Sequence, residues 1–274
     1  MADQAKGFWP ESTKIDSTVA HEARVYDYLL GGTTNFEVDR KAAVRAGAAV
    51  GGIEVARASV RSNRLFLKQV VRYLALEAGV DQFLDIGTGI PNDDNAPAVA
   101  QATLPSARVV SVDNDPIVLA HTHALLKSTR EGATDFFEAD LRHPGDIVRQ
   151  AKSTLDLRRP VAVLLLAVLH HVPDADDPYE IVAQLMKALP SGSYLALTHL
   201  TGDVLTEETD ALARSVPKDA PYAFAVRSLA QVGRFFEGLE LVAPGIVPID
   251  QWRPDEPDAP YEGRFHYGAV ARKP

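Results

Sequence analysis

Two glycines, Gly87 and Gly89, follow an apolar run in the segment DIGTGIPNDDN at 85–95. A glycine turn at the end of a strand lets backbone N–H groups approach a ligand closely, although a purely structural turn would look the same. A dinucleotide fingerprint needs a third glycine, and Asn92 occupies that position. Asp85 also argues against a dinucleotide, because its carboxylate would repel a diphosphate but attract a cationic amine. S-adenosylmethionine carries such an amine, so the loop favours it over a nicotinamide cofactor.

Two further aspartates follow the next two apolar runs of the chain. Asp113 ends the run ARVVSVD, and a carboxylate at that position can accept both hydroxyls of a ribose. A nicotinamide enzyme would use the same acid in the same way, so Asp113 indicates a nucleoside without choosing between the two cofactors. Asp140 follows the next run, where adenosylmethionine enzymes bind the adenine amino group. Alone it would be a helix cap or a solvated loop acid, but three acids at three successive strand ends favour a binding site.

Histidines are the candidates for a general base. His170 and His171 follow the fourth apolar run, and because strand side chains alternate we expect at most one of them to face the site. Methyl transfer from a sulfonium is a direct displacement, so a base is optional and both histidines could be structural. His121 and His123 would point away from each other on a helix, and we predict no metal site.

The segment ARVYDYLLGGTTNF at 23–36 could reach the site from outside the strands. Its tyrosines Tyr26 and Tyr28 lie in a helical run just before the break at Gly31-Gly32. They could simply fill an apolar core. The sharper hypothesis is a lid that closes over the cofactor, with Gly31 near the ligand and Tyr28 as a further candidate for the base.

Five cations recur at helical spacing in the segment 55–79: Arg57, Arg61, Arg64, Lys68 and Arg72. A solvated helix face is the simplest interpretation of such a stripe. The alternative is that Arg64, with Asn63, borders the carboxylate of the cofactor or an anionic acceptor.

Short β-type runs alternate with helical runs from position 81 onward, which is typical of a parallel sheet flanked by helices. The expected strands are 82–86, 107–113, 134–139, 161–169, 193–200, 239–247 and 264–272, the last two antiparallel neighbours. Asp115-Pro116 and Asp177-Pro178 predict helix starts, the second with a capping box completed by Glu180. Further helices are expected at about 206–216 and 228–237.

Residues 1–80 contain no strand pattern and read as helices, ending in one long amphipathic helix at 55–79. We therefore expect an N-terminal helical cap or lid over 1–80 and a cofactor-binding domain over 81–274. The length of 274 residues allows one elaborated domain or one domain with such an addition.

Composition narrows the classes of function. The net charge of −9 disfavours nucleic acid as a partner, and the chain has no cysteine, which removes disulfides, thiolate metal sites and cysteine nucleophiles. Neither a signal peptide nor an apolar run long enough to span a membrane is present. The expected location is cytoplasmic, with no membrane partner.

The glycine loop, Asp113, the segment Ala139-Asp140-Leu141 and LAVLHHVPD at 166–174 together resemble the class I S-adenosylmethionine-dependent methyltransferases. The last segment is similar to that of small-molecule members such as the quinone-biosynthesis methyltransferases. A closer resemblance covers the whole chain and is to an actinobacterial methyltransferase-like family long labelled a domain of unknown function. It rests on six segments in order: ARVYDYLLGGTTNF, RSNRLFLKQVVRYLA, QFLDIGTGIP, VDNDPIVLAH, ADLRHP and LPSGSYLALTH.

The resemblance implies an α/β Rossmann-like fold with a seven-stranded sheet of order 3-2-1-4-5-7-6, the last strand antiparallel. Pro91 stands where many class I enzymes have a third glycine, so Asn92 or Asn95 could supply a polar contact there. The cofactor-binding residues that we expect are Tyr28, Gly31, Arg64, Asp85, Gly87, Thr88, Gly89, Asn95, Asp113, Asn114, Asp140, Leu141 and Ala167.

Methyl transfer from S-adenosylmethionine to a small molecule is the function that these observations favour. A cofactor-binding sensor or regulatory protein without turnover is the alternative from another class, since the binding acids are present but no base is demonstrated. A nicotinamide oxidoreductase is disfavoured by Asp85 and Asn92. The sequence predicts neither the acceptor nor the oligomeric state.

Overall fold

A mixed β-sheet forms the centre of the computed structural model, which describes residues 15–125, 127–207, 224–254, 263 and 265–274. The strand order is β3-β2-β1-β4-β5-β8-β6, and β7 pairs with β8 off this path. The strands are β1 (Gln82–Ile86), β2 (Arg108–Asp113), β3 (Ala133–Glu138), β4 (Ala162–Leu166), β5 (Tyr194–Leu200), β6 (Glu240–Leu241), β7 (Val247–Pro248) and β8 (His266–Arg272). The first five strands are parallel, and β8 runs antiparallel to its neighbours. The expected order and the antiparallel last strand are confirmed.

The central strands are apolar on both faces because helices cover both sides of the sheet. Every residue of β1 and β4 is buried, which is typical of parallel strands. The register aligns Ile86 with Val112 across β1 and β2, and Asp113 with Glu138 across β2 and β3. The carboxyl ends of these strands therefore lie together at one edge of the sheet.

The run at 239–247 differs from the expected single strand. It forms two short strands, β6 and β7, joined by a turn in which the N–H of Gly245 donates to the carbonyl of Val242. Gly245 has a φ of +91°, a left-handed conformation that a continuous strand does not contain. The turn therefore divides the run, and both parts pair with β8.

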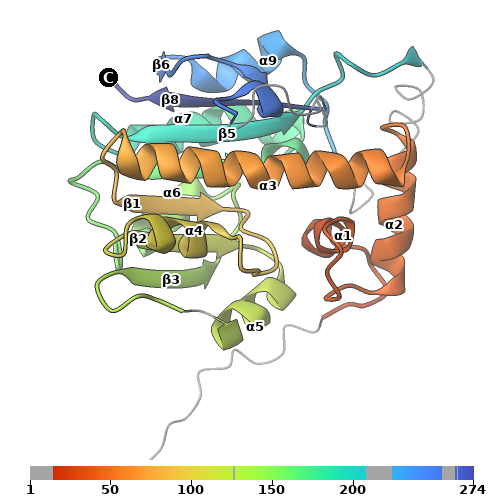
Figure 1. Ribbon diagram of the computed structural model, residues 1–274, viewed down its shortest axis with the longest axis horizontal. Coiled ribbons are helices and arrows are strands. Elements are labelled where there is room, and N and C mark those ends of the chain that lie inside the picture. Colours follow the sequence, from red (N-terminus) through yellow and green to blue (C-terminus); the bar gives the residue numbers. More distant parts are fainter. Residues whose placement is uncertain (1–14, 126, 208–223, 255–262, 264) are drawn as a thin grey trace, which may run out of the picture.

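Helices pack on both faces of the sheet (Figure 1). The long α3 (Ile53–Leu76) and α4 (Ala96–Thr103) cover one face, where Phe66 and Val70 of α3 join the sheet core. The helices α6 (Pro144–Ala151), α7 (Pro178–Lys187) and α9 (Leu229–Gly233) contribute to the core on the other face. The helix α5 (Pro116–Leu125) packs on β3. The predicted helix at 206–216 lies almost entirely outside the described residues.

The two predicted helix starts differ in the structure. Asp115 caps α5, because its carboxylate accepts a hydrogen bond of 2.9 Å from the N–H of Ile117. The capping box at Asp177 and Glu180 was wrong. The 3-10 turn η2 (Asp174–Asp176) leads into Asp177 at a φ of +50°, and from this backbone the side chain makes no capping bond.

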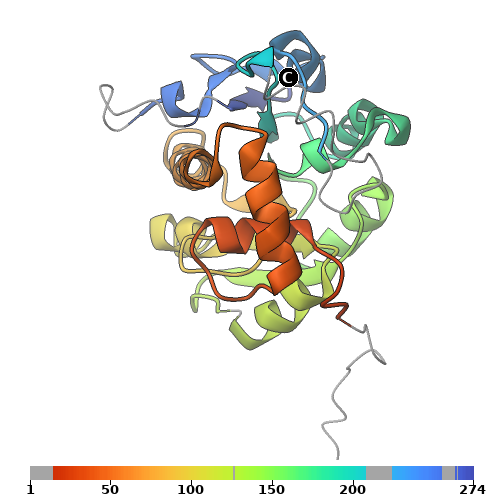
Figure 2. The same ribbon diagram turned by 90° about the vertical axis from the view of Figure 1, so that its right-hand side faces the viewer.

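The described part of the first 80 residues consists of helices and turns. The helices α1 (Glu22–Leu29) and α2 (Glu37–Ala48) stand beyond the carboxyl ends of the parallel strands, and Figure 2 shows them in front of the sheet. They form a small core with the start of α3, which includes Leu29, Ala43 and Val60. The helix α3 thus contacts both α1 and α2 and the sheet.

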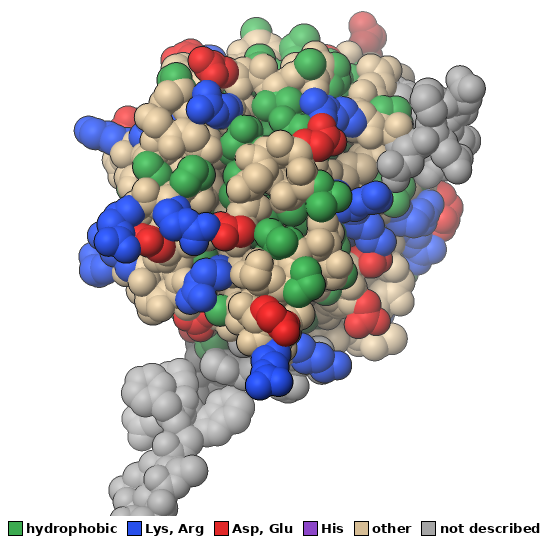
Figure 3. Space-filling view, turned by 60° about the vertical axis from the view of Figure 1, so that its left-hand side comes forward, with side chains coloured by type: hydrophobic (Ala, Val, Ile, Leu, Met, Phe, Trp, Pro, Cys, Tyr) green, Lys and Arg blue, Asp and Glu red, His purple; other side chains and the backbone are tan. Residues whose placement is uncertain are grey.

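The surface has mixed charge on the face shown in Figure 3, where Lys and Arg side chains lie beside Asp and Glu side chains. Lys68 pairs with Asp94, and Arg159 pairs with Asp81. None of the described helices is long and apolar enough to cross a membrane.

Candidate functional site

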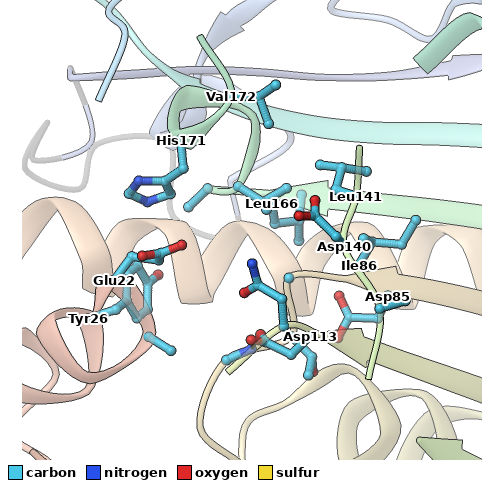
Figure 4. Close-up of a pocket in the computed structure, with 18 of the residues that line it drawn as sticks. Glu22, Tyr26, Asp85, Ile86, Asp113, Asp140, Leu141, Leu166, His171 and Val172 are labelled. Atoms are coloured by element: carbon cyan, nitrogen blue, oxygen red, sulfur yellow. Dashed lines mark hydrogen bonds between the residues drawn. The ribbon is translucent and has the colours of Figure 1, made fainter. Parts of the chain in front are cut away.

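An open cavity of about 960 Å³ lies at the carboxyl ends of β1, β2 and β4, between the sheet and α1 (Figure 4). Glu22 and Tyr26 of α1 face the acidic side chains of the strand ends across it. Ten of the expected cofactor residues line this cavity: Arg64, Asp85, Gly87, Thr88, Gly89, Asp113, Asn114, Asp140, Leu141 and Ala167. The parallel register brings these residues together from segments far apart in the sequence.

The glycine loop turns back over the end of β2. The N–H groups of Gly87 and Thr88 donate to the carbonyl of Val112, at 2.8 and 3.2 Å. Gly87 has a φ of +77°, and a Cβ on it would lie 2.6 Å from the Cγ2 of Val168. Gly89 is also left-handed, at +68°. The loop therefore needs glycine at both positions, and at Gly87 for close packing as well.

Asp85 and Arg64 combine opposite charges at one end of the cavity. Burial raises the pKa of Asp85 to about 6, although a hydrogen bond from Thr88 and the charge of Arg64 both oppose this shift. The guanidinium of Arg64 lies over the ring of Tyr26, and its buried Nε has no hydrogen-bond partner among the described residues. A carboxylate beside a guanidinium is complementary to the ammonium and carboxylate of a free amino acid.

Asp113 is held in place by backbone groups. Its Oδ2 accepts from the N–H of Gly89 at 2.8 Å, and its Oδ1 accepts from the N–H of Asp115 at 3.0 Å. Burial raises its pKa to about 6, although these two bonds oppose that shift. Because each carboxylate oxygen has a second lone pair, the side chain can still accept two hydroxyl groups from a ligand.

Asp140 occupies the third strand end. Its carboxylate accepts from the backbone N–H of Arg142 at 2.8 Å and pairs with the guanidinium of the same residue at 3.0 Å. Arg142 in turn contacts Asp176 at 2.6 Å. Asp140 therefore shapes its loop as well as lining the cavity.

Three of the expected cofactor residues lie elsewhere. Asn95 caps α4 by accepting from the N–H of Ala98, and it faces a neighbouring hollow. The ring of Tyr28 lies under the guanidinium of Arg57, and this residue lines neither the cavity described above nor the neighbouring chamber described below. Gly31 borders a separate groove beside α3.

Tyr26 is the tyrosine that reaches the cavity, because it follows Glu22 by one helical turn on α1 whereas Tyr28 points to another side. Its hydroxyl donates to the carbonyl of Val60 at 3.2 Å and accepts from Asn63 at 3.0 Å. The Oδ1 of Asn63 accepts from the hydroxyl of Thr198 at 2.7 Å, and that hydroxyl accepts from the N–H of Ala167 at 2.8 Å. This chain joins α1, α3, β5 and the end of β4.

A buried group of charges fastens α1 to the start of α5. The Nδ1 of His21 lies 3.0 Å from the carboxylate of Asp115, and Arg24 lies 3.7 Å from both Asp115 and Asp39. Burial alone would lower the pKa of His21, but the contact with Asp115 and the nearby acids outweigh it and raise the pKa. These contacts hold α1 beside Asp113.

A second chamber of about 720 Å³ adjoins the first one. Glu22, Tyr26, Ala167 and His171 line both cavities. Apolar side chains from α1, α3 and the ends of β5 and β8 form most of the second chamber: Val25, Leu29, Ala56, Val60, Leu200 and Phe265. A ligand in one cavity can therefore touch a ligand in the other.

His171 alone of the pair lines the cofactor cavity, whereas both His170 and His171 line the second chamber. The strand β4 ends at Leu166, and the left-handed Ala167 leads into the 3-10 turn η1 (Leu169–His171), where side chains no longer alternate. The buried Arg227 holds this turn by donating to the carbonyls of Leu169 and Val172. Arg227 carries no sequence motif that could have identified it.

Comparison with known proteins gives a family match over nearly the whole chain. A family model described as S-adenosyl methyltransferase matches residues 9–274. The crystal structure of a DUF574 family protein from Streptomyces avermitilis MA-4680 is 43% identical, with a TM-score of 0.86, and the match covers 95% of this chain and 100% of that one. A candidate methyltransferase from Thermobifida fusca YX is 38% identical, with a TM-score of 0.84 and coverage of 97% and 99%.

A curated relative is more distant. The trans-aconitate 2-methyltransferase of Methylobacterium radiotolerans is 28% identical over 176 residues, which is 62% of this chain. The matched part spans 59% of that relative's length.

Proposed function

The chain belongs to the S-adenosyl methyltransferase family, whose cofactor is S-adenosylmethionine, and from that premise we propose methyl transfer to a small-molecule acceptor in the second chamber. The observation that supports it is the junction of two cavities at Ala167 and His171. One cavity offers the three acids of the strand ends and the guanidinium of Arg64 to a zwitterionic nucleoside, and the other offers an apolar space beside it. The cofactor supplies a methyl group bonded to a positively charged sulfur.

Each cofactor residue has a role that its surroundings support. Asp85 would receive the ammonium of the cofactor, and Arg64 would receive its carboxylate through a guanidinium whose Nε has no hydrogen-bond partner among the described residues. Asp113 would accept the two ribose hydroxyls, since backbone bonds already fix its orientation. Asp140 would accept a hydrogen bond from the adenine amino group.

The N-terminal helices would act as a cap over both cavities. Glu22 and Tyr26 contribute to both walls, and the Tyr26–Asn63–Thr198 chain connects α1 to the loop after β4. This supports the division into a cap over 1–80 and a cofactor domain over 81–274, with α3 shared between them. Excluding water from the junction favours displacement at the methyl carbon over hydrolysis.

Turnover tests the proposal. The purified protein is incubated with S-adenosylmethionine labelled in its methyl group and with a small-molecule extract of its source cells. We expect label in a small product, and at least a tenfold lower rate with Asp85→Asn. Binding of S-adenosylhomocysteine without any labelled product from the extract would contradict turnover and favour a sensor.

A further inference from the structure

The second chamber contains almost no charge. Glu22, at the junction with the cofactor cavity, is the one acidic side chain among the described residues that line it, and none of those residues is a lysine or an arginine. The walls from α1 and α3 are apolar over most of their area, as Val25, Leu29 and Val60 illustrate. An anionic acceptor would lose its hydration here and find no opposite charge to replace it, and a cationic acceptor would find only Glu22 at the junction.

Two histidines of the chamber, His170 and His266, are neutral at neutral pH. Burial lowers the pKa of His170 well below its ordinary value, and the neighbouring histidines and Arg227 add to this shift. Burial also lowers the pKa of His266 to about 4, and the Nδ1 of His266 lies 2.9 Å from the hydroxyl of Ser59. Neither ring therefore offers a positive charge to an anionic acceptor at neutral pH.

His170 has one hydrogen-bonding atom without a partner. Its side chain is 6% exposed, and its Nδ1 is buried with no hydrogen bond to any described residue. A buried polar atom with no partner in the protein takes its hydrogen bond from an ordered water or from a ligand, and a ligand hydroxyl in the chamber can replace such a water. A hydroxyl group can supply it in either tautomer of the ring, because a hydroxyl both donates and accepts.

We infer that the acceptor is an uncharged and largely apolar molecule whose hydroxyl group bonds to His170. This inference rests on the proposed function, because it describes the second substrate of the same site. It separates this chain from an enzyme for a polycarboxylate such as trans-aconitate, the substrate named for the curated relative. A tricarboxylate would need several cations, which the described lining does not provide.

Four probes with one ring system test the charge preference: 2-naphthylmethanol, 2-naphthoate, 2-naphthylmethylamine and 2-methylnaphthalene. Binding to the full chain saturated with S-adenosylhomocysteine is measured at pH 8 by calorimetry or fluorescence. We expect the alcohol to bind at least tenfold more tightly than the anion or the cation, and roughly fivefold more tightly than the hydrocarbon. Equal or tighter binding of the naphthoate, the amine or trans-aconitate would overturn the inference.

Variants test the role of His170. In His170→Phe the alcohol should lose its advantage over the hydrocarbon, because the ring remains but the hydrogen bond is gone. In His170→Asn the advantage should persist, since the amide can hydrogen-bond near the position of Nδ1. His143→Phe is the matched control, because His143 is exposed and its side chain makes no capping bond to α6. An advantage that survives in His170→Phe would contradict the assignment.

Binding of S-adenosylhomocysteine and the preference among the probes together distinguish a failure of the proposed function from a failure of this inference. If the protein does not bind S-adenosylhomocysteine, the proposed function and this inference both fail. If it binds S-adenosylhomocysteine but prefers a charged probe, the inference alone fails. Should His170→Phe not fold, His170→Leu replaces it, and the alcohol should again lose its advantage over the hydrocarbon; an advantage that persists would contradict the assignment.

Discussion

At the residue scale, the proposed binding of the cofactor's amino acid end relies on the opposite charges of Asp85 and Arg64. A buried carboxylate is unfavourable in its ionised form, and Arg64 offsets this only in part, since the pKa of Asp85 remains raised to about 6. A bound ammonium group would stabilise the ionised form of Asp85 further. Asp85 therefore favours a cationic ligand group, and Arg64 favours an anionic one.

Cofactor affinity should depend on pH through Asp85. The ionised form attracts the ammonium, so affinity is full above pH 6 and falls as the pH drops through about 6, where Asp85 takes up a proton. We expect up to about tenfold weaker binding of S-adenosylhomocysteine for each pH unit below that point. Calorimetry at pH 8, 6 and 5 measures it. Asp85→Asn should bind weakly at pH 8 and lose less affinity on acidification than the unmodified protein, because only Asp113, whose pKa is also about 6, still takes up a proton. An equally steep loss in this variant would contradict the role of Asp85.

Replacement of Arg64 should affect only the amino acid end of the cofactor. Arg64→Met removes the charge but keeps the apolar stem, and we expect binding of S-adenosylhomocysteine to weaken at least tenfold. Methylthioadenosine, which lacks that end, should bind within about twofold of its normal affinity. Arg72→Met, on the same helix but outside the cavity, is the control. Equal losses for both ligands would indicate that Arg64 only supports the fold.

At the element scale, the site is built where parallel strands end and short turns begin. The sequence allowed Asp85, Asp113 and Asp140 to be placed together. Each lies at or just after the end of an apolar run, and these runs end at the same edge of the sheet. Backbone turns were harder to predict. The left-handed residues Ala167 and Asp177 are ordinary L-amino acids whose conformation depends on tertiary contacts, and they decide where the following side chains point.

Tertiary contacts also decide which side of the N-terminal helix α1 faces the site. A helical pattern shows that Tyr26 and Tyr28 face different directions, but it does not say which direction meets the sheet. The answer comes from the hydrogen bond between Tyr26 and Asn63, which links segments distant in sequence. The function of Arg227 in holding the turn of His170 was missed for the same reason.

The glycine loop should not tolerate a side chain at Gly87. In Gly87→Ala the left-handed backbone and the contact with Val168 should lower the free energy of unfolding by about 1–3 kcal/mol and weaken cofactor binding. Urea denaturation and calorimetry measure the two effects. Gly145→Ala is the control, since its Cβ would meet nothing within 4 Å. A Gly87→Ala protein as stable as Gly145→Ala would show that the loop can relax.

At the scale of the whole molecule, stability against acid depends on the buried histidines. The folded protein keeps His266 neutral down to about pH 4, while the unfolded chain protonates it below about 6.5. Stability is therefore lost as the pH falls below about 6.5. Asp85 and Asp113 act in the opposite direction, because their raised pKa values let the folded state bind protons below about pH 6.

A single variant isolates the contribution of His266. His266→Gln keeps a hydrogen-bonding group near Ser59 but cannot take up the proton on unfolding. Between pH 7 and pH 5 we expect the unmodified protein to lose about 2 kcal/mol more of its free energy of unfolding than this variant does. Denaturation curves at the two pH values measure the difference. Identical losses would mean that His266 is protonated in the folded state.

The central claim is that S-adenosylmethionine lies with its amino acid end between Asp85 and Arg64 and its sulfur toward the chamber of His170 and His171. A crystal structure of the complex with S-adenosylhomocysteine tests it most directly. We predict the ammonium within hydrogen-bond distance of Asp85, the carboxylate at Arg64, and the sulfur facing the junction at Ala167. A ligand bound outside this cavity, or with its sulfur turned away from that junction, would contradict the account.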